Sequence, residues 1–68
     1  MKSTNANVVE WYATCPYCDD TVDEYGCQTK AVENGWRPTK EQRKKLEDNN
    51  VWICPNCKQL FKIDSWDT

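Results

Sequence analysis

Two short stretches, Cys15-Pro16-Tyr17-Cys18 and Cys54-Pro55-Asn56-Cys57, dominate the sequence of this chain. Each is a Cys-Pro-x-Cys turn, and each follows a run rich in aromatic and β-branched residues. The proline fixes one backbone dihedral between the two cysteines and so favours a turn. Such a turn presents two thiolates at about the separation that one metal ion needs. Together the two turns predict a single four-thiolate metal site made by Cys15, Cys18, Cys54 and Cys57.

The length of the chain leads to the same expectation. It has 68 residues, of which 38% are hydrophobic, below the roughly 45–50% usual for globular proteins. A domain shorter than roughly 70 to 80 residues rarely folds on apolar burial alone and usually carries a metal or disulfides. Zinc contributes roughly 10 to 16 kcal/mol to the folding of zinc-finger peptides. We therefore expect one Zn²⁺ per chain, bound as a condition of folding.

A disulfide framework is the alternative use of these cysteines. The five cysteines are an odd number, and the polar residues 1–7 include no apolar run that could act as a signal peptide. We therefore expect a reducing, cytoplasmic location, in which such cysteine pairs are more often metal-binding or catalytic than cross-linked. Cys27 is left over and is predicted to be a half-buried free thiol.

Residues 8–25 and 50–66 resemble the two zinc knuckles of zinc ribbon proteins. That resemblance implies two β-hairpins, each with a Cys-x-x-Cys turn, that clamp one zinc ion. It implies no single function, because zinc ribbons serve in nucleic-acid binding, protein docking and structural support. The predicted fold class is a small metal-stabilised α+β fold, a zinc ribbon with a short helix inserted at about 39–49.

Two other resemblances remain open. The run 48–57 is similar to the second half of a rubredoxin, which implies one iron in the same four-sulfur geometry and electron transfer; rubredoxins have glycine where this chain has Asp19 and Lys58. The motif Cys15-Pro16-Tyr17-Cys18 after the run 8–14 resembles a glutaredoxin active site, which implies thiol redox chemistry. The glutaredoxin resemblance leaves Cys54 and Cys57 without a role.

The rest of the chain divides around the two turns. Residues 1–7 are predicted to be a disordered tail, and residues 8–68 a single domain. Alternating apolar positions predict a strand over 8–14, and a return strand is expected at about 21–25. Strands on both sides of the second turn complete the pattern. The predicted core comprises Val9, Trp11, Val51, Ile53, Phe61 and Ile63.

Two helices are expected between the hairpins. Thr39 and Gln42 form a capping-box pattern at the start of a polar helix, in which Leu46 is the one clearly apolar residue. A helix so short and polar needs tertiary packing, so Leu46 is predicted to anchor it. Another helical turn is expected within 27–36, ended by Asn34-Gly35.

Charge and aromatic content bear on the partner. The formal net charge is −2, which argues against general DNA binding, but five of the nine basic residues gather in 37–45. Four Trp and three Tyr are more than so small a core can enclose, so Trp36 and Trp52 are predicted to be exposed. Tryptophan and arginine are common in binding hot spots. The candidate partner-binding residues are Trp36, Arg37, Lys40, Arg43, Lys44, Lys45 and Trp52.

These features favour a protein that is not an enzyme. The chain has no His and no Gly-rich phosphate loop, and a metal held by four cysteines has no open position for water. We expect a regulatory or adaptor protein that docks on a larger protein, without a membrane or small-molecule partner. The alternative is a nucleic-acid-binding zinc ribbon that uses the basic residues and a stacking Trp; a second alternative is rubredoxin-like electron transfer or thiol redox.

Overall fold

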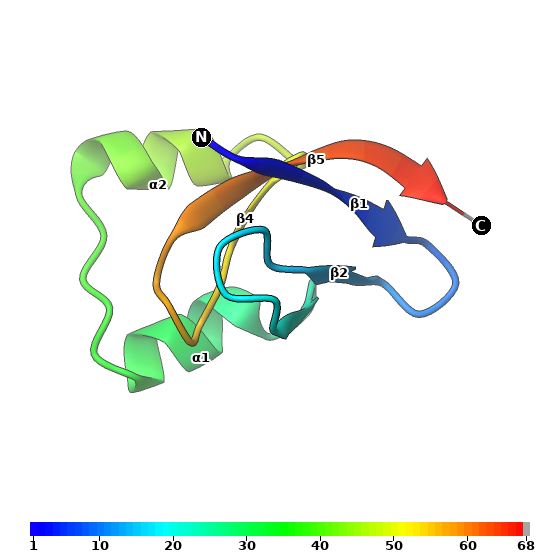
Figure 1. Ribbon diagram of the computed structural model, residues 1–68. Helices are drawn as coiled ribbons and strands as arrows, with labels where there is room; N and C mark the ends of the chain where they lie inside the picture. Colours follow the sequence, from blue (N-terminus) through cyan, green and yellow to red (C-terminus); the bar gives the residue numbers. More distant parts are fainter. Residues whose placement is uncertain (68) are drawn as a thin grey trace.

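The computed structural model describes residues 1–67 and shows a small α+β protein with a curled five-stranded sheet and two helices (Figure 1). The sheet order is β3-β2-β1-β5-β4. The helices and strands, in chain order, are β1 Ser3–Asn7, β2 Tyr12–Thr14, β3 Thr21–Asp23, α1 Cys27–Glu33, α2 Lys40–Leu46, β4 Val51–Ile53 and β5 Leu60–Asp67.

Each Cys-Pro-x-Cys turn lies between two antiparallel strands. The first turn joins β2 to β3, with Tyr12 opposite Asp23, and the second joins β4 to β5, with Trp52 opposite Phe61. The two hairpins predicted from the cysteine turns are therefore present. They occupy the two outer parts of the sheet, because β1 lies between β2 and β5.

The prediction of a disordered tail at residues 1–7 is wrong, because Ser3–Asn7 forms the central strand of the sheet. β1 pairs antiparallel with β2 and parallel with β5, and the register with β5 shifts between Thr4 and Asn5. The signal was weak in the sequence because Ala6 is the one apolar side chain of the strand, buried to 2% exposure. Pairing on both sides uses backbone groups, which every residue type provides.

The first predicted strand is shorter than expected. β2 covers Tyr12–Thr14, whereas residues 8–11 form the turn between β1 and β2. The side chain of Asn7 starts this turn, since its Oδ1 accepts hydrogen bonds from the N–H groups of Val9 and Glu10. Such side-chain acceptance is the usual role of Asn in turns. Val9 consequently lies at the tip of the turn rather than in the core.

The helices agree with the sequence prediction. Thr39 caps α2 through the full capping box, with Thr39 Oγ1 accepting from Gln42 N–H and Gln42 Oε1 accepting from Thr39 N–H. Leu46 packs against the core cluster and so anchors this polar helix. α1 begins at Cys27 and buries Cys27 and Ala31. Both helices contact β4.

The core is only partly the predicted one. Val51, Ile53, Phe61 and Ile63 are buried as expected. Val9 is 72% exposed and Trp11 38% exposed, so these two residues were wrongly assigned to the core because they belong to the turn rather than to a strand. The core also contains buried side chains that the sequence did not indicate: Ala6, Ala13, Val22, Ala31, Trp36 and Trp52.

Neither helix of the part of the chain that the structure describes is long and apolar enough to cross a membrane.

The central position of β1 leads to a testable prediction. Replacing Ala6 with Asp places an unpaired charge at a position that is 2% exposed, so it should lower the free energy of unfolding by about 3 kcal/mol or more. The control is Asn5→Asp, at a neighbouring exposed position of the same strand. Thermal unfolding followed by circular dichroism measures both. Equal stability of the two variants would contradict a structural role for β1.

Candidate metal centre

The first cysteine turn is closed by two backbone hydrogen bonds. Cys15 N–H donates to the carbonyl of Asp20 at 2.7 Å, and Asp19 N–H donates to the carbonyl of Cys15 at 2.9 Å. Tyr17 N–H points at Cys15 Sγ, 3.4 Å away. A backbone donor directed at sulfur stabilises the thiolate form of the cysteine.

The second turn repeats this backbone pattern at the equivalent positions. Cys54 N–H donates to the carbonyl of Gln59 at 3.1 Å, and Lys58 N–H donates to the carbonyl of Cys54 at 2.8 Å. The two turns are thus two copies of one knuckle, defined here as Cys15–Asp20 and Cys54–Gln59.

The residue after the second cysteine of each knuckle has a left-handed backbone. The φ angle is 65° at Asp19 and 59° at Lys58. Glycine adopts this region without steric cost, whereas Asp and Lys pay a small one. Both knuckles therefore hold the backbone shape that glycine gives rubredoxins, so the absence of glycine did not signal a different turn.

The two knuckles face each other and bring the four cysteine sulfurs together. All four Sγ atoms lie within 4.8 Å of one another, with 3.6 Å between Cys15 and Cys57 and 3.5 Å between Cys18 and Cys54. A metal with sulfur bonds of about 2.3 Å in a tetrahedron needs sulfur separations of about 3.8 Å. The structure therefore brings together the four predicted ligands in an arrangement that suits a metal ion.

Burial and the nearby thiols make the site unfavourable for four thiolates without a cation. Desolvation raises the pKa of Cys54, and it raises the pKa of Cys57 to about 12. The backbone N–H of Asp20 lowers the pKa of Cys18 to about 7. Because a bound metal dication favours deprotonated thiols, it would offset the desolvation that opposes the thiolate form.

Polar groups outside the cluster position the knuckles. Asn34, just after α1, donates from Nδ2 to the carbonyl of Pro55 at 2.9 Å and so ties the second knuckle to the helix. On the first knuckle, Tyr17 Oη accepts from Lys2 N–H at 2.9 Å, and Lys2 Nζ lies 5.2 Å from the centre of the Tyr17 ring. No periodic pattern in the sequence signals these contacts. They join segments far apart in the chain.

Cys27 does not belong to the cluster. Its side chain is buried at the start of α1, with Sγ 3.7 Å from the carbonyl oxygen of Glu24, and burial raises the pKa of the thiol. The prediction of a free thiol agrees with this position, although Cys27 is buried rather than half-buried.

The prediction that Trp36 and Trp52 are exposed is wrong. Trp36 is 7% and Trp52 4% exposed, and both belong to the hydrophobic core cluster. Trp52 packs edge-to-face on Phe61 and on Trp66, with ring centres 6.3 and 5.7 Å apart. Trp52 is therefore a core residue. In contrast, the five basic candidates are exposed: Arg37, Lys40, Arg43, Lys44 and Lys45.

Trp36 nevertheless reaches a groove between α1 and α2. The groove has a volume of about 590 Å³, and its apolar lining includes Val32, Trp36, Pro38 and Leu46. Arg43 lines it as well. Two of the predicted partner-binding residues, Trp36 and Arg43, thus meet at one surface, which we call the helix groove.

Comparison of the chain with protein-family models, with curated proteins and with solved structures finds no match. The fold and the site accordingly rest on the geometry described above: a small α+β protein with a four-cysteine cluster that is compatible with a zinc-knuckle arrangement.

The site makes a prediction that separates the cluster from the fifth cysteine. Cys54→Ser removes one of four sulfurs and should reduce the bound metal from one ion per chain to a small fraction, with loss of the folded far-UV spectrum. Cys27→Ser is the matched control, since Cys27 lies outside the cluster, and it should keep one ion. Native mass spectrometry measures the metal, and circular dichroism measures the fold. A Cys54→Ser protein that retains both would rule out the four-sulfur site.

Proposed function

We propose that this protein is a non-catalytic zinc-binding adaptor or regulator of the zinc ribbon type, which docks on a larger protein. The observation that carries the proposal is the cluster of four Sγ atoms within 4.8 Å of one another. Four thiolates complete the tetrahedron that structural zinc prefers and leave no position for substrate or water. The metal's role in this proposal is to hold the two knuckles together.

The proposal that zinc is the ion rests on the structural character of the site. Each knuckle presents its cysteines on a tight turn closed by backbone hydrogen bonds, and the ligands come from two hairpins on opposite parts of the sheet. A metal that binds both hairpins would therefore connect two parts of the sheet that the small core holds together only weakly. Iron in the same four-sulfur geometry is the alternative, and identifying the ion in the purified protein distinguishes the two.

Metal removal tests this part of the proposal. Excess chelator should unfold the protein, because metal binding contributes roughly 10 to 16 kcal/mol in small zinc domains, more than a 68-residue chain gains otherwise. One equivalent of Zn²⁺ should restore the fold. We expect a colourless protein with one zinc, measured by mass spectrometry, absorption and circular dichroism. A red, iron-loaded protein would contradict zinc binding and favour electron transfer. A chain that stays folded without metal would contradict a structural role for the metal.

The helix groove supports docking on a protein partner. Its lining is mainly apolar, and Val32 beside it is 48% exposed, so a partner's apolar side chain can bury surface there. One exposed cation, Arg43, lines the groove together with the carboxylates Glu33 and Glu47. We therefore assign the groove a partner segment that carries an apolar side chain, with one acidic group placed to pair with Arg43. A nucleic acid would use the cations but would leave the apolar lining unused.

Site-specific cross-linking tests the groove. A photoreactive residue at Val32 should cross-link to one protein in the cell of origin, and Arg43→Glu in the same chain should reduce the product about tenfold through charge repulsion. The matched controls are the photoreactive residue at Thr21, on the exposed edge strand β3, and the charge change Lys62→Glu on β5. Equal cross-linking at Val32 and Thr21, or a nucleic-acid adduct at Val32, would contradict docking through the groove.

A further inference from the structure

A ladder of aromatic rings runs from the core to the surface at the end of the sheet away from the cysteines. From the inside outward, the rings are Phe61, Trp52, Trp66, Trp11 and Tyr25. Successive ring centres lie 6.3, 5.7, 5.9 and 6.4 Å apart, and every contact is edge-to-face. Such contacts contribute beyond the burial of area, so the inner rings hold the outer ones in place.

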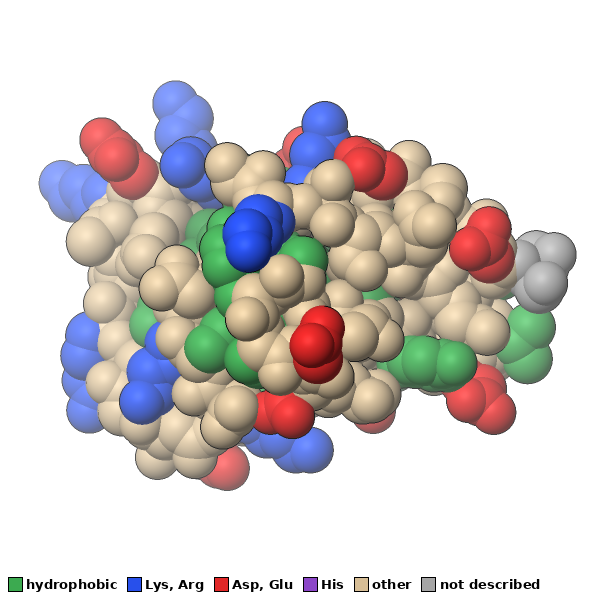
Figure 2. Space-filling model, viewed as in Figure 1, with side chains coloured by type: hydrophobic (Ala, Val, Ile, Leu, Met, Phe, Trp, Pro, Cys, Tyr) green, Lys and Arg blue, Asp and Glu red, His purple; other side chains and the backbone are tan. Residues whose placement is uncertain are grey.

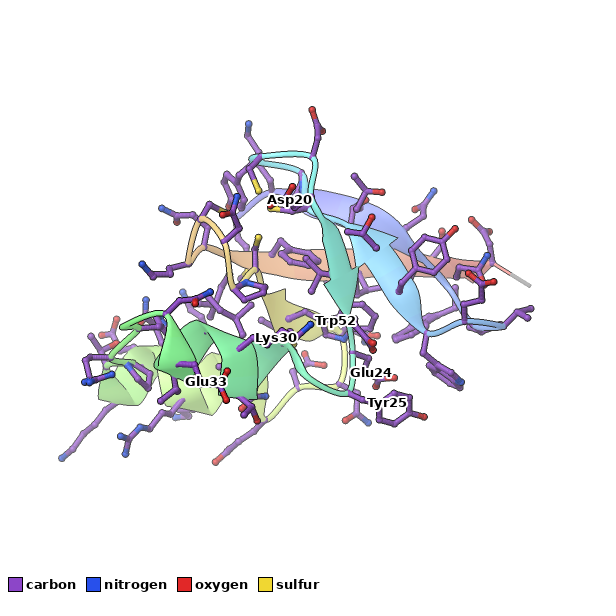
Figure 3. All side chains as sticks on the ribbon, turned by 90° about the horizontal axis from the view of Figure 1, so that it is seen from below. Asp20, Glu24, Tyr25, Lys30, Glu33 and Trp52 are labelled. Carbon is purple, nitrogen blue, oxygen red and sulfur yellow. The ribbon has the colours of Figure 1, made fainter. Side chains whose placement is uncertain are left out.

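The two outer rings of the ladder are exposed. Tyr25 is 78% exposed and Trp11 38% exposed, and Val9 beside Trp11 projects from the turn between β1 and β2. Figure 3 shows Tyr25 pointing away from the body of the molecule, next to Glu24. Tyr25 contacts Trp11 alone in the ladder and keeps most of its ring open to a partner, whereas Trp11 contacts two rings and keeps part of its surface open.

Trp11 also has an unusual backbone. Its φ angle is 55°, in the left-handed region, which is a genuine outlier for a bulky side chain. The carbonyl of Trp11 accepts a hydrogen bond from Glu24 N–H at 3.0 Å, which joins the turn 8–11 to the turn that carries Tyr25. Conformational strain of this kind is concentrated at functional surfaces. The strained turn brings Trp11 and Tyr25 side by side.

Acidic side chains surround these rings. Glu10 precedes Trp11, and Asp23 accepts the N–H of Tyr25 on Oδ1 at 3.1 Å. Glu24 precedes Tyr25, and the carbonyl of Asp67 accepts from Val8 N–H at 2.8 Å, which places the end of β5 at the same turn. We call this surface the acidic aromatic end: Val9, Glu10, Trp11, Asp23, Glu24, Tyr25 and Asp67.

The basic residues lie elsewhere for the most part. Lys30 on α1 is an exception, because its side chain extends over Gly26, the residue after Tyr25. Lys2 and Lys62 lie near the opposite, amino-terminal ends of β1 and β5, and five cations belong to 37–45. In Figure 2, acidic and hydrophobic side chains appear at the end where β5 finishes, whereas most of the blue side chains lie toward the other end. The local charge is therefore negative.

We propose that the acidic aromatic end is a second docking surface, which binds a Lys- or Arg-rich segment of a protein partner. A cation over the face of Trp11 or Tyr25 gains cation–π attraction, and the carboxylates of Glu10, Asp23 and Glu24 add charge complementarity. Beside the rings, Val8, Trp11, Glu24, Asn49 and Trp66 line a depression of about 520 Å³, enough for a long side chain. This surface is separate from the helix groove, so neither assignment depends on the other.

The test uses the full, metal-loaded chain and two defined peptides, hexa-arginine and hexalysine, with hexaglutamate as the charge control. Backbone and indole NMR shifts should change at Trp11 and Tyr25 and leave α2 unchanged. Tyr25→Ala should weaken the binding of hexa-arginine about fivefold, because it removes an open ring without changing charge. Glu10→Lys should weaken it further, and more so at 50 mM than at 200 mM salt.

Matched variants distinguish a site from general attraction between opposite charges. Tyr17→Ala removes a partly exposed ring, 37% exposed, on the first knuckle, and Glu41→Lys makes the same charge change on α2; neither should change the affinity by as much as twofold. Equal loss in Tyr25→Ala and Tyr17→Ala, shifts spread over the whole surface, or no binding at 50 mM salt would overturn the proposal. The proposal would also be overturned if the NMR shifts of Trp11 changed with protein concentration in the absence of peptide, because a second copy of the chain would then occupy the surface. Arg43→Glu should not affect hexa-arginine binding, so failure of the helix groove and failure of this surface are separate results.

Discussion

The convergence of four cysteine sulfurs is the constraint on which the rest of the structure depends. The knuckles belong to hairpins on opposite parts of the sheet, β2–β3 and β4–β5, separated by β1. Adjacent strands lie about 4.8 Å apart, so β2 and β5 are about 10 Å from each other across β1. Sulfurs within 4.8 Å of one another therefore require the knuckles to lean together over the start of β1, which the curled sheet permits (Figure 1).

That geometry explains why a polar amino-terminal segment is an integral strand. Two hairpins joined only through a cluster at one end would leave unpaired backbone groups along β2 and β5. β1 pairs with both, and Lys2 just before it contacts Tyr17 of the first knuckle. The strand thus contributes hydrogen bonds where it can contribute little apolar surface, with Ala6 its single buried side chain. Backbone pairing on both sides of β1 thus compensates in part for the large core that a short chain lacks.

The sequence predicted those features that depend on local chemistry. Each cysteine turn follows from the Cys-Pro-x-Cys spacing, and the start of α2 from Thr39 and Gln42, because a turn and a cap are fixed by residues close in the chain. Features set by distant partners were missed. β1 has no alternating apolar pattern, and Trp36 and Trp52 could be placed only with knowledge of the helices and strands that cover them. Trp11 was misplaced because a strained turn at φ 55° interrupts an apparently continuous strand.

The same sheet separates the four-cysteine cluster from the acidic aromatic end. The knuckles lie at the amino ends of β1 and β5, whereas the acidic aromatic end lies at their carboxyl ends, beside Asn7 and Asp67. The inner rings Trp52 and Trp66 span the space between, so the exposed rings are supported by the core that the knuckles enclose. In a protein with little interior, the aromatic rings that fill the core also contact the rings that reach the surface. Under the proposal of a second docking surface, Trp11, Trp52 and Trp66 would therefore serve stability and recognition through one continuous set of contacts.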